Sequence, residues 1–280
     1  MNTSTSQYHI SNKRGLPINF DLRFPESTKP APAIIIMHGF KGYKDWGFLP
    51  YIAEKLAEAG AITVNMNFST SGIIDPVNRK YNVELFASMT ITELLSDAKL
   101  VIQSLPNYLS DESWNGEIYL LGHSLGAAIA VLVASEIKGI SKIAMWGSIS
   151  TFQRYSERQK ADWREKGALQ FVDMKIGQQM KININYLEDI EKNFHNFVII
   201  DSIKNVNASI LILHGAQDKT ATLREARALA ASAGEKVELR IIENTGHAFG
   251  AEHPLQKPPP KAVEKVLIET GVFFGLEKWI

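Results

Sequence analysis

Short apolar runs alternate along the chain with longer segments in which apolar residues recur at helical spacing. Six runs rich in β-branched residues predict strands, over residues 33–38, 61–68, 117–122, 142–147, 209–215 and 237–242. The segments that separate or follow them predict helices, over residues 46–59, 90–105, 125–138, 221–233 and 261–280. Strands that alternate with helices form a mostly parallel central sheet with helices on both faces. The pattern therefore predicts an α/β fold.

Two segments depart from this alternation. Residues 8–24 precede the first parallel strand and predict an antiparallel hairpin. Residues 151–204 lie between two predicted strands and predict a helix, a hairpin around Gly177 and a second helix. Insertions at the carboxyl ends of parallel strands usually cap a site, so we interpret this one as a small cap or lid. The alternative is a surface elaboration with no role in binding.

This interpretation divides the chain into an α/β core, residues 1–150 and 205–280, and a cap insertion, residues 151–204. The cap carries large apolar side chains that either line an acyl or aryl pocket or simply pack the cap onto the core. They are Trp163, Phe171, Met174, Met180 and Tyr186.

Composition narrows the classes of function. The 280 residues are 45% hydrophobic and 21% charged, which is ordinary for a globular protein. Thirty basic residues balance thirty acidic ones, which disfavours nucleic acid or an anionic membrane surface as a partner. The absence of cysteine excludes thiolate catalysis and cysteine metal sites. We expect a small, neutral partner, no membrane span and, without a secretory signal, a cytoplasmic location.

One motif points to nucleophilic catalysis. The sequence GHSLG, residues 122–126, stands between a predicted strand and an alanine-rich predicted helix. Gly-x-Ser-x-Gly in this place is the nucleophile elbow, a strained turn that exposes a serine and needs small neighbours. We therefore predict that Ser124 is a nucleophile and that Gly122 and Gly126 relieve crowding around it.

A serine needs a base, and the base needs an acid that orients it. Asp218 follows the predicted strand 209–215, and His247 follows the next one. The order Ser, Asp, His is the one expected for α/β hydrolases, so we predict a triad of Ser124, Asp218 and His247. Asp201 and Glu243 are the nearest rivals for the acid role.

Three other histidines receive structural roles. We assign His123 to packing, because it would point away from the adjacent serine. We expect His38 to orient the loop that follows it, and His253 to be structural.

Catalysis of acyl transfer also needs two backbone amides that face the developing oxyanion. The amide of Leu125, directly after the serine, is one candidate. The sequence MHGFKG ends the first parallel strand, and Gly39 and Gly42 let the chain turn so that the Phe40 amide faces the serine. No phosphate-binding glycine pattern is present in this loop.

Together the segments HGFKGYKDW, GHSLG, LHGAQD and TGHAFGAEHP resemble the α/β-hydrolase superfamily, over nearly the whole chain. The similarity is greatest to small serine esterases of the feruloyl or cinnamoyl esterase and dienelactone-hydrolase-like kind. The resemblance implies Ser124 as nucleophile, Asp218 as acid, His247 as base, and Phe40 and Leu125 as oxyanion donors. It also implies a cap at residues 151–204.

These observations predict a carboxylic ester hydrolase that forms an acyl-enzyme, with no metal or organic cofactor. One alternative is a serine peptidase similar to the prolyl-oligopeptidase catalytic domain. A second is a ligand-binding protein on a hydrolase scaffold. The sequence leaves the physiological ester and the oligomeric state open.

Overall fold

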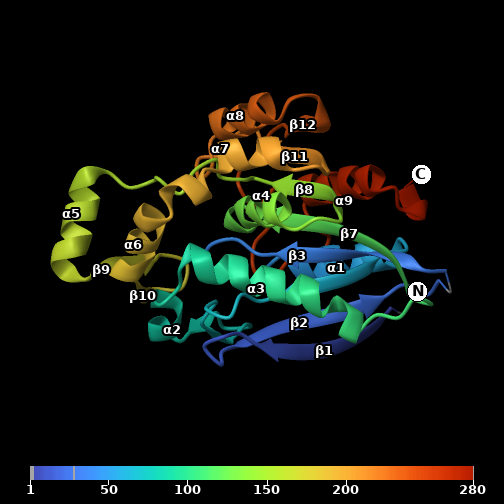
Figure 1. Ribbon diagram of the computed structural model, residues 1–280, viewed down its shortest axis with the longest axis horizontal. Coiled ribbons are helices and arrows are strands. Elements are labelled where there is room, and N and C mark those ends of the chain that lie inside the picture. Colours follow the sequence, from blue (N-terminus) through green and yellow to red (C-terminus); the bar gives the residue numbers. More distant parts are fainter. Residues whose placement is uncertain (1–2, 28, 280) are drawn as a thin grey trace.

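A twisted eight-stranded sheet runs through the centre of the protein (Figure 1). The computed structural model describes residues 3–27 and 29–279. The strands lie in the order β1-β2-β4-β3-β7-β8-β11-β12. Their bounds are β1 (Ser4–Ser11), β2 (Pro17–Phe24), β3 (Ala31–Met37), β4 (Ile62–Met66), β7 (Trp114–His123), β8 (Ile140–Trp146), β11 (Ser209–Gly215) and β12 (Val237–Ile242).

Six neighbouring strands, from β4 to β12, are parallel, and these are the six that the apolar runs predict. The hairpin predicted at residues 8–24 is also confirmed: β1 pairs antiparallel with β2, which pairs antiparallel with β4. The register aligns the carboxyl ends, since Met37 pairs with Gly122 and His123 with Trp146. The loops after these strands therefore meet at one edge of the sheet.

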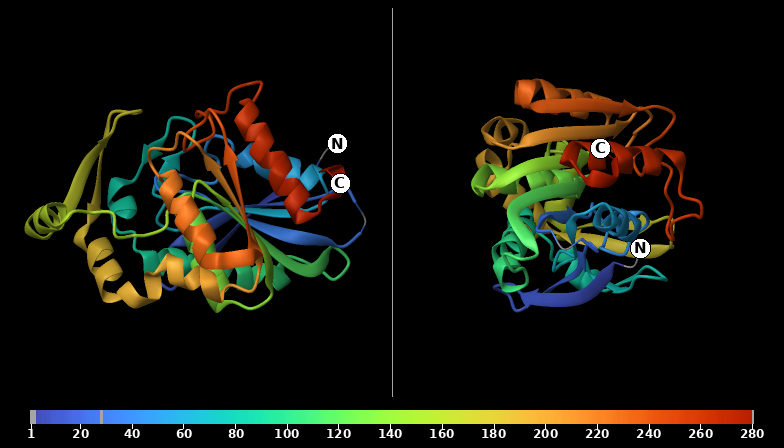
Figure 2. Two further views of the ribbon diagram at one scale, coloured as in Figure 1. Left: turned by 90° about the horizontal axis from the view of Figure 1, so that it is seen from above. Right: turned by 90° about the vertical axis from the view of Figure 1, so that its right-hand side faces the viewer.

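Helices cover both faces of the sheet, as predicted, because side chains of the parallel strands are apolar in both directions. Ile34 and Ile36 of β3 pack with the helices of one face, and Ile35 packs with those of the other. The first face carries α1 (Leu49–Glu58) and α9 (Lys261–Phe274) (Figure 2). The second carries α3 (Ile91–Ser104), α4 (Leu125–Glu136) and α8 (Leu223–Ala233).

The segment predicted as a cap leaves the sheet after β8 and returns to it at β11. It contains α5 (Glu157–Lys166), β9 (Ala168–Asp173), β10 (Gln178–Asn183), α6 (Ile184–Lys192) and α7 (Ile199–Ser202). The expected helix, hairpin and second helix are confirmed, and α5 and the hairpin project beyond the sheet at the left of Figure 1. A capping box at Ser156 starts the helix α5. The one buried residue of this helix is Trp163, whose indole N–H donates to the Ile182 carbonyl of β10 at 2.9 Å.

Two short features between β4 and α3 were not predicted. They are the two-stranded hairpin β5 (Ile73–Asp75) and β6 (Lys80–Tyr81), and the helix α2 (Val83–Ala87). Among the described residues, no helix has both the length and the apolar character that a membrane crossing requires.

Candidate active site

Ser124 occupies a sharp turn between β7 and α4. Its backbone has φ 56° and ψ −116°, a region that residues other than glycine rarely adopt. The Ser124 amide donates to the Trp146 carbonyl at 2.8 Å, which ties the turn to the neighbouring strand β8. Such backbone strain costs about 1–3 kcal/mol and persists where the surrounding structure enforces it.

The two glycines of the motif allow the strand and the helix to approach closely. A Cβ atom on Gly122 would lie 2.4 Å from the Gly126 carbonyl oxygen. One on Gly126 would lie 2.4 Å from the Met37 oxygen and 2.5 Å from the His38 oxygen. The prediction that these residues relieve crowding is therefore confirmed.

Asp218 and His247 lie side by side, at the ends of β11 and β12. The His247 Nδ1–H donates to Asp218 Oδ2 at 2.7 Å, and Asp218 Oδ1 accepts from the amides of Thr220 and Ala221 at 2.8 and 3.0 Å. Burial alone would raise the pKa of Asp218, but the hydrogen bonds from His247 and from these amides hold it below its usual value. The carboxylate is therefore ionised and holds Nε2 of His247 free to accept a proton.

The turn that carries Ser124 contacts the loop that carries His247. The buried ring of His123 donates through Nε2 to the His247 carbonyl at 3.0 Å, and the two imidazole centroids are 4.8 Å apart. Gly147 follows Trp146 and has φ 53°, and a Cβ there would lie 3.3 Å from His247 Nδ1. Within the described chain, the Ser124 hydroxyl has no hydrogen-bond partner, so the structure does not join it directly to His247.

The loop after β3 contacts Ser124 from the side of β7 that lies opposite β8. A Cβ on Gly39 would come within 3.0 Å of the Ser124 Cβ, and the Gly42 amide closes a turn onto the Gly39 carbonyl at 2.9 Å. In the part of the chain that the structure describes, the amides of Phe40 and Leu125 donate no hydrogen bond. Both are thus available to a ligand oxygen.

A family model described as class 3 lipase matches residues 56–150, a segment that contains Ser124. No curated protein sequence matches the chain significantly. Among solved structures, Est1E from Butyrivibrio proteoclasticus with bound ferulic acid is 21% identical, with a TM-score of 0.68 over 94% of this chain and 98% of that one. Dienelactone hydrolase from Anabaena variabilis is 14% identical, with a TM-score of 0.62 over 97% of each chain.

A third match is the acylaminoacyl peptidase of Pyrococcus horikoshii, 18% identical with a TM-score of 0.67. It covers 100% of this chain but 43% of the peptidase. The chain has the α/β-hydrolase fold. The resemblance inferred from the sequence motifs is thus confirmed at the level of the fold.

Within the described part of this α/β-hydrolase fold, neither rival acid forms a hydrogen bond or ion pair with His247. Asp201 is exposed and pairs with Lys204 at 2.6 Å, and Glu243 is exposed after β12. His38 is buried and does contact the loop that it was expected to orient. Its Nδ1–H donates to the Gly39 carbonyl at 2.9 Å, and burial lowers its pKa to about 4, so the ring is neutral.

His253 bridges two loops, as a structural residue does. Its Nδ1 accepts from the Gly47 amide at 3.0 Å, and its Nε2 lies 2.9 Å from the Pro76 carbonyl. A further histidine near the site, His214 at the end of β11, has no role that the sequence motifs predict. Its Nε2–H donates to the Ala221 carbonyl at 2.8 Å and lies 3.5 Å from Asp218 Oδ2, which holds the loop that carries the acid.

A second contact without a signal in the sequence is an ionic one, between the inserted segment, residues 151–204, and the loop after β3. Asp173, at the end of β9, is 2% exposed and accepts from Lys41 Nζ at 3.1 Å and Arg79 Nη2 at 3.4 Å. Next to it, the rings of Phe171 and Phe40 lie 6.0 Å apart. The hairpin β9–β10 therefore rests on the loop that presents the Phe40 amide.

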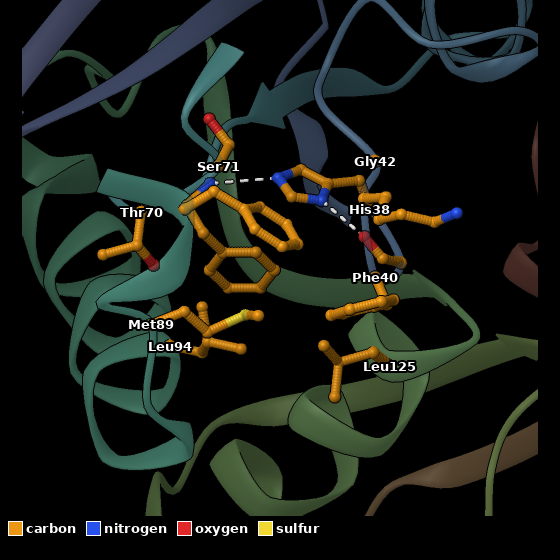
Figure 3. Close-up of a pocket in the computed structure, with 12 residues that line it drawn as sticks. His38, Phe40, Gly42, Thr70, Ser71, Met89, Leu94 and Leu125 are labelled. Carbon is orange, nitrogen blue, oxygen red and sulfur yellow. Dashed lines mark hydrogen bonds between the residues drawn. The ribbon is translucent and has the colours of Figure 1, made fainter. Parts of the chain in front are cut away.

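An apolar pocket lies beside this loop, between the β4 and β7 ends of the sheet (Figure 3). None of the five cap residues considered from the sequence lines it. Trp163, Met180 and Tyr186 are buried and Met174 is 86% exposed. The first three therefore pack within the protein, which is the simpler of the two interpretations. The pocket is lined by His38, Gly39, Phe40, Lys41, Gly42, Phe68, Thr70, Ser71, Phe86, Met89, Leu94 and Leu125.

Proposed function

We propose that the protein is a carboxylic ester hydrolase that works through an acyl-enzyme on Ser124. The observation that carries this proposal is the 2.7 Å hydrogen bond from His247 to an ionised Asp218, on the turns that adjoin a strained serine. The matches to a class 3 lipase family model and to solved esterases support the same chemistry. We further propose that its partner is a small-molecule ester and that it works in the cytoplasm.

In the proposed mechanism, His247 Nε2 takes the proton of the Ser124 hydroxyl as its oxygen attacks the ester carbonyl. The Asp218 carboxylate holds the imidazole in the right tautomer and stabilises it when it becomes positively charged. His247 then gives the proton to the departing alcohol. Water, activated by the same histidine, frees the acid and restores the serine.

The amides of Phe40 and Leu125 would stabilise the negative charge on the carbonyl oxygen in both steps. Loss of one such donor typically costs about 3 kcal/mol of transition-state stabilisation. The residue after the serine begins α4, so its amide has no partner within the helix and adds the positive end of the helix dipole.

The test combines covalent labelling with turnover. A fluorophosphonate should label the wild type and leave Ser124→Ala unlabelled, because that variant lacks the nucleophile. Asp218→Asn should lower kcat for p-nitrophenyl acetate by about 10⁴-fold, because it reverses the tautomer of the histidine. Ser135→Ala, on α4, and Asp201→Asn, at an exposed position, are the matched controls and should behave as the wild type. An Ser124→Ala enzyme with wild-type turnover would refute the mechanism.

Two other activities are separated by the same assay. The structural match to an acylaminoacyl peptidase favours including an aminoacyl-naphthylamide beside the esters. Preferred cleavage of the amide would select the peptidase. Tight ligand binding without covalent labelling would select a binding protein on a hydrolase scaffold. Methyl ferulate in the panel tests the feruloyl or cinnamoyl type.

A further inference from the structure

The order of strands separates two sides of Ser124. β3 and β4 lie on one side of β7, whereas β8, β11 and β12 lie on the other. Asp218 and His247 follow β11 and β12, so both lie on the second side. In acyl transfer the histidine gives its proton to the departing alcohol, which therefore leaves on the side of His247. The acyl substituent of an ester then points toward the ends of β3 and β4.

The apolar pocket of Figure 3 lies on this acyl side. Phe40 and Leu125, whose amides we propose as oxyanion donors, both line it. Met89 and Leu94 face Leu125 across the pocket, and Phe86 of α2 packs against Phe40 with ring centroids 5.4 Å apart. A carbonyl oxygen between the two amides would therefore place its acyl carbon at the mouth of this pocket.

The pocket is small, and most of its apolar walls are firmly packed, although Phe40 is 37% exposed. Its cavity volume is about 10 Å³, close to the least that holds a single water-sized group. Phe86, Met89, Leu94 and Leu125 are each at most 5% exposed, so the rest of the protein supports them from behind. A methyl group fills this space, and each further methylene requires a wall to move.

We propose that this pocket holds the acyl group and restricts it to acetyl, so that the substrates are acetate esters. This inference rests on the proposed ester hydrolase function. The Ser124 oxygen forms a bond to the acetyl carbon, the bond from that carbon to the alcohol oxygen breaks, and the serine proton reaches the alcohol through His247. Water then releases acetate. A feruloyl or fatty acyl group is too large for the pocket.

The experiment compares kcat/KM for the p-nitrophenyl esters of acetate, butyrate, octanoate and ferulate, each corrected for spontaneous hydrolysis. We expect wild-type kcat/KM to fall at least about tenfold from acetate to butyrate, since a single methylene changes discrimination by 10–200-fold. Met89→Ala removes the end of the wall opposite Leu125 and should raise the butyrate-to-acetate ratio at least about tenfold. The matched control is Met174→Ala, at a position 86% exposed in the cap, which should keep the wild-type ratio.

The outcomes separate this inference from the function on which it rests. A wild type that is labelled at Ser124 but prefers butyrate, octanoate or ferulate overturns the acetyl pocket and keeps the ester hydrolase. A wild type that is neither labelled nor active on any ester overturns the proposed function. A folded Met89→Ala with an unchanged ratio also overturns the pocket. If thermal unfolding shows that this variant is unfolded, Leu94→Ala, on the same wall, is measured in its place with the same expectation.

Discussion

The close approach of α4 to β3 makes Gly126→Ala a sharp test of how the site is held. The new Cβ would lie 2.4 and 2.5 Å from the carbonyl oxygens of Met37 and His38, whereas ordinary contacts begin at 3.4 Å. Both obstacles are backbone atoms, one in the last residue of the central strand β3 and one in the residue that follows it, so neither can rotate away. The helix must therefore withdraw by about 1 Å, at a cost near the upper end of the ~1–3 kcal/mol typical of overpacking.

The same displacement moves the amide of Leu125, which precedes Gly126. A misplacement of about 1 Å at a reacting centre can cost about 10²-fold in rate. We therefore expect Gly126→Ala to lower kcat/KM for p-nitrophenyl acetate about 100-fold. A loss of ~3 kcal/mol in the free energy of unfolding should lower Tm by roughly 6–12 °C in a chain of this size.

The assays are thermal unfolding by circular dichroism and ester turnover, normalised to the fraction that a fluorophosphonate labels. Gly246→Ala is the matched control. It also lies near the site, but its Cβ would meet a single atom, the Gln217 carbonyl oxygen, at an ordinary 3.6 Å. If Gly126→Ala kept the Tm and the turnover of the wild type, the reasoning from close approach would be wrong.

Two further predictions concern buried carboxylates. Burial, helped by the nearby Glu93, raises the pKa of Asp97 from 3.8 to about 6, so the native state loses about 3 kcal/mol of unfolding free energy as pH rises from 4 to beyond 6. Urea unfolding should show this fall in the wild type and not in Asp97→Asn. Asp173→Asn leaves Lys41 and Arg79 without their carboxylate and should lower the unfolding free energy by about 1–3 kcal/mol, the cost of leaving a buried polar group unsatisfied. It should also lower kcat severalfold, because Lys41 follows Phe40 in the loop after β3.

Each of these two predictions, for Asp97 and for Asp173, can be contradicted by a specific result. An equal change of unfolding free energy with pH in the wild type and in Asp97→Asn would show that this carboxyl does not carry the effect. Asp162→Asn, on the exposed face of α5, is the control for Asp173. If the two asparagine variants had the same Tm and turnover, the ionic contact between cap and loop would not position the site.

Local pattern was enough to predict the parallel strands and the helices between them. Their runs are apolar, and the central strands are buried on both sides, as the complete burial of Ile34, Ile35 and Ile36 illustrates. The hairpin β5–β6 and the helix α2 could not be predicted in this way. They contain between two and five residues each, which is too few to establish a period.

The candidate site likewise contains residues that could be predicted from the sequence and contacts that could not. Ser124, Asp218 and His247 follow strands whose ends share an edge, so their placement at one edge of the sheet, and the pairing of Asp218 with His247, could be expected from chain order. The contact of Asp173 with Lys41 and Arg79 joins three loops far apart in sequence and leaves no local signal. The role of Trp163 could not be predicted either. An aromatic residue in a charged helix gives the same sequence pattern whether it lines a pocket or packs inside the protein. In the structure Trp163 is buried within the inserted segment.

The contact between the inserted segment and the loop after β3 has an evolutionary consequence. The insertion begins after β8 and ends before β11, but its hairpin β9–β10 packs on α2 and, through Asp173, on the loop that carries Phe40 and Lys41. Because these two residues also line the apolar pocket, a change in the insertion affects the pocket wall. Under the proposed function, we expect the insertion and this loop to have changed together during the divergence of related chains.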